Sequence, residues 1–144
     1  MKIGIGSDHG GYELKEFIKK EFQGKVEFKD YGTFSNESVD YPDFGQAVGE
    51  AVVKGEVERG IVICGTGIGI SIAANKVKGV RCALCNDLFS ARLAREHNNA
   101  NVLAMGGRVI GTALAKEIVE LFLETEFEGG RHGRRVEKIG EILS

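Results

Sequence analysis

The sequence of 144 residues has no tryptophan, only one proline and no long uninterrupted run of apolar residues. Without such a run the chain offers no candidate membrane-spanning helix, so we expect no membrane partner. A net charge of −2 argues against a general nucleic-acid-binding protein, which would be strongly basic. Residues 2–6 already read as a core strand, which leaves no room for a signal peptide, and we therefore expect a cytoplasmic protein.

Cysteine and histidine are also scarce, with three of each. The odd number of cysteines, Cys64, Cys82 and Cys85, fits a reducing compartment better than a disulfide framework. Cys82 and Cys85 have C-x-x-C spacing, but they lie in a predicted strand, where residues three apart point to opposite faces. We therefore interpret both as packing residues, and the sequence predicts neither a metal site nor a cofactor.

What the sequence does have is a regular alternation of strand-like and helix-like segments. With 42% hydrophobic and 28% charged residues, the chain is typical of globular proteins, and residues 1–144 suit one domain. The alternation predicts an α/β fold with a five-stranded parallel sheet and helices on both faces. In such sheets ligands bind beyond the carboxyl ends of the strands. The predicted strands cover residues 2–6, 26–30, 61–63, 81–85 and 101–105.

The most informative stretch covers residues 61–76. A short β-branched run is followed by glycines at every second position, Gly65, Gly67 and Gly69, and then by apolar residues at helical spacing. Such a strand, loop and helix start form an anion site, because glycines allow close approach and free helix N–H groups favour negative charge. Cys64 lies at the strand end in this field, which favours its thiolate. The alternative is a small core cysteine.

Two familiar phosphate motifs are missing from this stretch. The sequence after Gly65 and Gly67 has Ile70 where the dinucleotide fingerprint has its third glycine. No Gly-Lys-Ser/Thr follows the loop, so it is not a P-loop. Both departures weigh against a nucleotide ligand.

Polar residues also follow the other predicted strands. Because the carboxyl ends of parallel strands share one edge of a sheet, we expect most of these residues to converge on the glycine loop. Simpler interpretations exist for most of them: Asp8 and Asp87 could only cap helices, His9 could only pair with a neighbouring carbonyl, and the residues from His97 could only form a polar helix end. The residues are Asp8 and His9 after the first strand, Asp87 and, beyond the next helix, His97 and Asn98 after the fourth, and Arg108 after the fifth.

Three arginines, Arg131, Arg134 and Arg135, precede a predicted last helix with Val136, Ile139 and Leu143 on its apolar face. Cations at a helix start oppose the helix dipole. An anion bound bidentately by the guanidinium groups would resolve this conflict, and a solvated basic patch is the alternative.

Several motifs together resemble one family, the type B ribose-5-phosphate isomerases, which are grouped with the galactose-6-phosphate isomerases. The resemblance covers essentially the whole chain, with the motifs in order and at matching spacing. The motifs are Ser7-Asp8-His9-Gly10-Gly11, Asp40-Tyr41-Pro42, Cys64-Gly65-Thr66-Gly67-Ile68-Gly69 with Ala73-Ala74-Asn75-Lys76, His97-Asn98, and Gly129-Gly130-Arg131-His132.

The resemblance implies a metal-free aldose–ketose isomerase with a Rossmann-like fold, whose active sites lie between the subunits of a homodimer, possibly paired into a homotetramer. It implies Cys64 as the catalytic base and His97 as the ring-opening acid, assisted at Thr66. A sister branch uses a glutamate where this chain has Ile70, so the chain resembles the cysteine branch. The implied substrate contacts are Asp8, His9, Gly65, Gly67, Ile68, Gly69, Ile70, Asn98, Arg108, Arg131 and Arg135.

The implied reaction interconverts ribose 5-phosphate and ribulose 5-phosphate in the pentose phosphate pathway. This reaction needs a base, donors for an enediolate oxygen and cations for the phosphate, and Cys64, the 65–70 loop and the arginines can fill these roles. Two alternatives remain: the same chemistry on a six-carbon sugar phosphate such as allose or galactose 6-phosphate, and a non-catalytic sugar-phosphate sensor.

Overall fold

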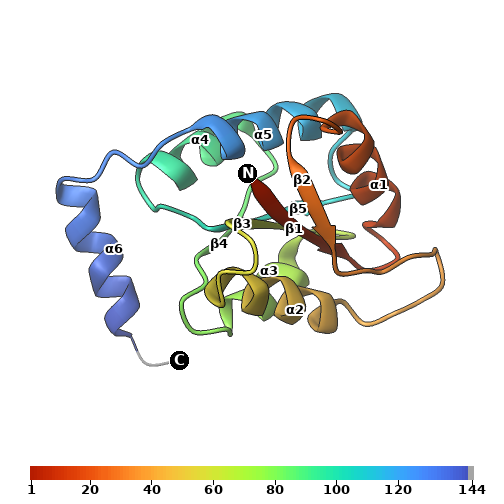
Figure 1. Ribbon diagram of the computed structural model, residues 1–144, viewed down its shortest axis with the longest axis horizontal. Coiled ribbons are helices and arrows are strands. Elements are labelled where there is room, and N and C mark those ends of the chain that lie inside the picture. The colour runs from red at the N-terminus through yellow and green to blue at the C-terminus, as the bar shows by residue number, and fades with distance from the viewer. Residues whose placement is uncertain (143–144) are drawn as a thin grey trace.

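The computed structural model describes residues 1–142, which form one five-stranded sheet with helices on both sides (Figure 1). The strands are β1 (Lys2–Ser7), β2 (Glu27–Asp30), β3 (Arg59–Cys64), β4 (Cys82–Leu84) and β5 (Val102–Gly106). The helices in the described residues are α1 (Tyr12–Glu21), α2 (Tyr41–Val53), α3 (Ile68–Asn75), α4 (Leu88–Glu96), α5 (Thr112–Glu124) and α6 (Arg131–Glu141).

The sheet has the strand order β2-β1-β3-β5-β4, and each pair of neighbours is parallel. Helices α1, α4 and α5 cover one face, and α2 and α3 cover the other, as the upper and lower layers of Figure 1 show. The prediction of a three-layer Rossmann-like fold is therefore confirmed. The strand order reverses between β1 and β3, and the loops that follow such a switch commonly hold the ligand.

The central strand β3 shows why the sheet is buried on both faces. Ile61 and Ile63 pack into the core under α1, α4 and α5, whereas Val62 and Cys64 pack into the core against α2 and α3. Because successive side chains of a strand alternate, an uninterrupted apolar run fills both cores at once. Cys64 belongs to this pattern as the last residue of the strand.

The last helix begins earlier than predicted. The sequence placed the three arginines before the helix, but α6 starts at Arg131, directly after Gly129 and Gly130, which have φ values of +71° and +58°. Both glycines adopt backbone conformations that other residues disfavour, so the chain turns there and the helix follows at once. Arg135 therefore lies in the second turn of α6, while Leu143 lies outside the described residues.

Helix α6 projects from the body of the molecule (Figure 1). Of its residues, only His132 is buried in the described chain. Ile139 and the following Ile142 are 46% and 70% exposed, and they line an open groove together with residues 75–81 of the body. A single copy of the chain thus leaves the apolar face of α6 largely uncovered. No helix within residues 1–142 has the length and apolar character needed to cross a membrane.

Candidate active site

The glycine loop joins the end of β3 to the start of α3 as the sequence predicted. Gly67 caps α3 with a left-handed φ of +82°, and its N–H donates a hydrogen bond to Sγ of Cys64 at 3.2 Å. The N–H of Ile68 donates to Oγ1 of Thr66 at 3.1 Å. The first N–H groups of a helix have no partner within the helix, so α3 presents donors at this edge. Cys64 thus lies beside a set of backbone donors suited to an oxyanion.

The loops after β1 and β5 close around the glycine loop. Asp8 donates its N–H to the Ile63 carbonyl at 3.2 Å, and its buried carboxylate accepts the Gly11 N–H at 3.1 Å. On the other side, the Gly107 N–H donates to the Cys64 carbonyl at 2.8 Å, and the Arg108 N–H donates to the Gly65 carbonyl at 3.0 Å. The prediction that these loops converge at the carboxyl edge of the sheet is therefore confirmed for three strands.

His9 and Arg108 line one open hollow at this edge, together with Asn36. Nδ1 of His9 accepts the Val39 N–H at 3.2 Å, so in the neutral ring Nε2 carries the proton and acts as a donor. A donor from His9 beside a guanidinium group is a suitable arrangement for an anion.

Two loop residues with predicted substrate contacts differ sharply in exposure. The Ile68 side chain is 52% exposed, whereas Ile70 is fully buried in the core between the sheet, α2 and α3. Only the backbone of Ile70 could therefore contact a ligand at this edge.

His97 and Asn98 lie at the opposite edge of the sheet, which differs from the expected convergence. Helix α4 starts near the end of β4 and runs back, so its C-cap His97 comes before β5. In the register of the sheet, Gly106 at the end of β5 lies beside Cys64, and Val102 at its start lies beside Gly60. The length of β5, about 13 Å at 3.3 Å per residue, therefore separates the two edges. One copy of the chain cannot bring His97 to Cys64.

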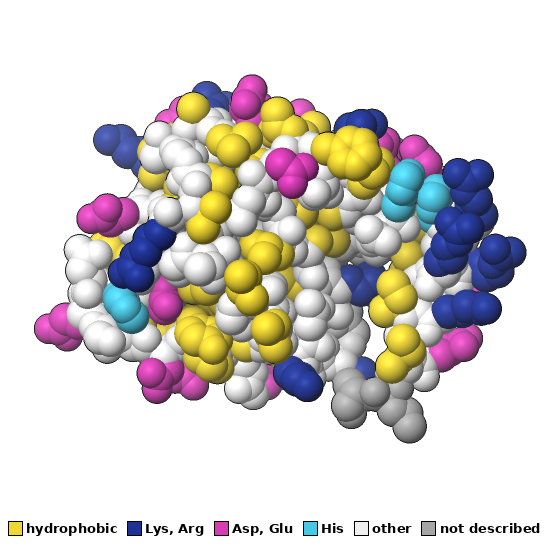
Figure 2. Space-filling view, turned by 180° about the vertical axis from the view of Figure 1, so that it is seen from behind, with side chains coloured by type: hydrophobic (Ala, Val, Ile, Leu, Met, Phe, Trp, Pro, Cys, Tyr) yellow, Lys and Arg dark blue, Asp and Glu magenta, His cyan; other side chains and the backbone are white. Residues whose placement is uncertain are grey.

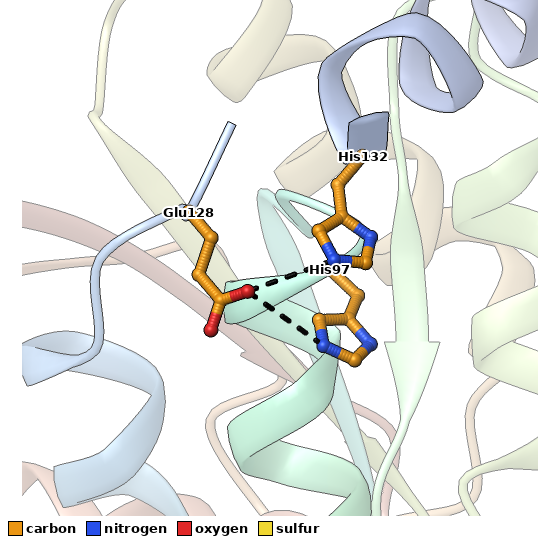
Figure 3. Close-up of side chains that lie close together, drawn as sticks. All are labelled: His97, Glu128 and His132. Carbon is orange, nitrogen blue, oxygen red and sulfur yellow. Dashed lines mark ion pairs between the residues drawn. The ribbon is translucent and has the colours of Figure 1, made fainter. Parts of the chain in front are cut away.

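Near His97, the structure assembles a cluster that the sequence did not predict (Figure 3). Oε1 of Glu128 lies 3.9 Å from Nε2 of His97 and 3.6 Å from Nε2 of His132, and the two rings stack with centroids 4.0 Å apart. The Glu128 N–H donates to the Glu96 carbonyl at 3.0 Å, which fixes the linker beside the end of α4. Glu128 and His132 are close in the sequence, but His97 comes from the distant end of α4, so no local motif could have revealed the whole cluster.

The charges around this cluster come from the first turns of α6. Burial lowers the pKa of His132, and the neighbouring charges of His97, Arg131 and Arg135 lower it further, against an opposing effect of Glu128. Figure 2 shows the two histidines beside the basic side chains of α6. The predicted phosphate residues Arg131 and Arg135 are thus near His97 and at the far edge from Arg108.

The structure confirms the predictions that Cys82 and Cys85 are packing residues and that Asp87 is a helix cap. Cys82 packs against the core on the α2 and α3 side, and Cys85 is buried in the opposite core. Burial raises the pKa of Cys82 strongly and that of Cys85 to about 12, so both remain protonated packing residues. Asp87 caps α4 by accepting the Ser90 N–H at 2.7 Å.

Fold and loops together define an α/β protein with a set of backbone N–H donors next to a buried cysteine at the carboxyl edge of its sheet. A family model described as Ribose/Galactose Isomerase matches residues 3–139. Ribose-5-phosphate isomerase B of Escherichia coli strain K12 is 51% identical over 142 residues, which cover 98% of this chain and 95% of that protein.

Two solved structures are closely similar to the fold. Ribose-5-phosphate isomerase B of Clostridium thermocellum is 62% identical with a TM-score of 0.96, and the match covers 98% of this chain and 96% of that one. The Mycoplasma genitalium ribose-5-phosphate isomerase B, solved with bound ribulose-5-phosphate, is 44% identical with a TM-score of 0.92, over 96% and 93% of the two chains. The chain belongs to the ribose/galactose isomerase family, and it is an isomerase.

Proposed function

We propose that this isomerase interconverts D-ribose 5-phosphate and D-ribulose 5-phosphate through an enediolate. The observation that carries the proposal is Cys64 at the end of β3, held by the Gly67 N–H at the mouth of the glycine loop. The similarity to the ribose-5-phosphate isomerases of Escherichia coli and Clostridium thermocellum supports the pentose substrate.

In this proposal Cys64 is the base that moves a proton between the two adjacent carbons of the open sugar. Negative charge then develops on the carbonyl oxygen, and the N–H groups at the start of α3 stabilise it. Thr66, whose hydroxyl is exposed beside these donors, assists the proton transfers at the sugar oxygens. Asp8 shapes this edge by holding the first loop against β3.

His97 opens the furanose ring, and it acts from a second copy of the chain. The support is geometric, because His97 and Cys64 lie at opposite edges of one sheet. A two-fold dimer pairs the same surfaces twice, so the amino edge of each copy can meet the carboxyl edge of the other. The exposed Ile139 and the groove beneath α6 supply apolar surface for this contact. The proposed unit is therefore a homodimer.

The same pairing would complete the phosphate site. Arg131 and Arg135 lie with His97 at one edge, and His9 and Arg108 lie at the other. Joined across the interface, these groups surround a phosphate, and Asn98 contacts the sugar next to His97. Phosphate binding then orients the reacting end of the sugar over Cys64.

A turnover assay with matched substrates tests the proposal. Ribose 5-phosphate should be converted with a higher kcat/KM than allose 6-phosphate or galactose 6-phosphate. Preference for a six-carbon substrate would assign the same chemistry to a hexose phosphate. Tight binding of all three sugars without turnover would instead indicate a sensor.

A further inference from the structure

The cluster of His97, Glu128 and His132 consists of side chains that can bind a metal ion. Two imidazoles and one carboxylate are the ligand set of many zinc sites with an open fourth position. Their three ligating atoms all lie within 4.8 Å of one another in a single copy of the chain. The set is therefore complete without a partner subunit.

The distances are close to those that a zinc ion requires. Zinc holds nitrogen and oxygen ligands at about 2.0–2.2 Å, so tetrahedral ligand atoms lie about 3.4 Å apart. The two Nε2–Oε1 distances of 3.9 Å and 3.6 Å exceed this separation by less than 1 Å. Both Nε2 atoms already face the same carboxylate oxygen, as Figure 3 shows.

The stacked rings must turn before both can bind one ion. At an interplanar angle of 8°, the lone pairs of the two Nε2 atoms run side by side and do not converge. His132 is held with only 9% of its side chain exposed, but His97 is 37% exposed and Glu128 is 51% exposed. Rotation of the His97 ring and a small shift of Glu128 therefore close the site without disturbing the core.

We propose that His97, Glu128 and His132 bind a zinc-class divalent cation, and that the bound cation inhibits the isomerase by withdrawing His97 from ring opening. The inhibitory part rests on the proposed function, whereas the binding part does not. Nitrogen and carboxylate ligands favour Zn²⁺ and Co²⁺ over Mg²⁺ and Ca²⁺, which prefer oxygen alone. The nearby charges of Arg131 and Arg135 oppose the cation, so binding should be reversible and sensitive to chelators.

Binding is tested with Co²⁺ on the purified full-length protein. Tetrahedral Co²⁺ should give an intense visible absorption band that Zn²⁺ abolishes and Mg²⁺ does not. His132→Gln and Glu128→Gln should each lose the band. The matched controls His9→Gln and Glu126→Gln, which change residues outside the cluster, should keep it, as should Cys64→Ala. Loss of the band in Cys64→Ala with retention in His132→Gln would overturn the site.

Inhibition is tested by comparing turnover with and without Zn²⁺ within each variant. Zinc should abolish most of the activity of the unaltered enzyme, and a chelator should restore it. Glu128→Gln should be resistant to the same zinc concentration, whereas Glu126→Gln should remain sensitive. Stoichiometric binding without inhibition would contradict the inhibitory role while leaving the isomerase activity intact. An enzyme inactive on every sugar before zinc is added would instead contradict the proposed function.

Discussion

The N–H of Gly67 donates to the Sγ of Cys64 over 3.2 Å, so one hydrogen bond ties the start of α3 to the end of β3. At the left-handed φ of +82°, Gly67 turns the chain from this bond directly into α3. The sulfur atom and the first donors of α3 are therefore held next to each other by one short backbone segment.

Gly67→Ala should damage both stability and activity. A Cβ at this position would lie 2.5 Å from Cδ1 of Leu84 and 2.8 Å from the carbonyl carbon of Met105. Besides this clash, the left-handed conformation costs a non-glycine residue about 1–2 kcal/mol. Gly55→Ala is the matched control, because Gly55 has a similar φ of +78° with nothing within 4 Å. Urea unfolding should show a larger loss for Gly67→Ala; equal losses would contradict the tight fit of the loop.

Cys64→Ala should lose roughly 100- to 10,000-fold of the isomerase activity, as expected for removal of a general base. Binding of the sugar phosphate should persist, because the phosphate contacts are intact. Steady-state kinetics and calorimetric binding measure the two properties separately. Cys82→Ala is the control, since burial keeps Cys82 protonated and inert. Near-normal turnover of Cys64→Ala would place the base elsewhere.

The sequence was sufficient for the sheet and for the loops at its carboxyl edge. Short apolar runs followed by glycines identified β1, β3 and β5. The loop after Cys64 follows from the local sequence pattern alone. The local sequence pattern did not predict that His97 lies at the opposite edge of the sheet from Cys64. A helix returns the chain to the amino edge, and its C-terminal residue therefore cannot share an edge with the residues that follow strands.

Other features could not be predicted because they depend on contacts between distant segments. Glu128 meets His97 only because the linker before α6 is fixed to the end of α4. The start of α6 depends on the positive φ values of Gly129 and Gly130, which the sequence permits but does not require. The surface that covers α6 could not be predicted either, because it lies outside the single chain, in which Ile139 is exposed.

Mixing two inactive variants should test the shared site. When Cys64→Ala and His97→Ala are dissociated together and reassembled, each mixed dimer has one site with both residues intact. Random pairing then restores about a quarter of the unaltered activity. Each variant alone, treated identically, is the control and should stay inactive. Light scattering that showed a fully active monomer would refute the shared site.

Arg135→Ala should raise KM for ribose 5-phosphate and also lower kcat. Phosphate binding positions the sugar, so its loss reduces the fraction of productive complexes as well as affinity. Arg134→Ala removes the same charge from the neighbouring position of α6 and serves as the control. Unchanged kinetics for Arg135→Ala, or equal effects of both changes, would contradict a specific phosphate contact.

The pairing of Lys15 with Asp30 should make stability depend on pH. The Lys15 side chain is fully buried, and its Nζ lies 2.6 Å from Oδ2 of Asp30, which also accepts from Lys19 at 2.7 Å. Burial by itself would raise the pKa of Asp30, but the hydrogen bonds from Lys15, Lys19 and the Gly32 N–H outweigh this effect and lower it. The carboxylate therefore stabilises the folded state above its unfolded pKa of about 3.9.

Two measurements check this dependence. Asp30→Asn leaves the buried Lys15 ammonium group with the longer 3.8 Å contact to Glu16 in place of its 2.6 Å pair with Asp30, and at pH 7 it should cost about 3–5 kcal/mol of unfolding free energy. As the pH falls from about 4, the folded protein loses the contribution of Asp30, so the difference in unfolding free energy between the unaltered protein and Asp30→Asn should shrink.

Glu21→Gln is the control, because its exposed pair with Lys116 should contribute only about 0–1 kcal/mol. Urea unfolding at pH 7 and pH 3 compares all three proteins. A difference that stayed constant or grew toward pH 3 would show that Asp30 does not stabilise the fold as its charged form.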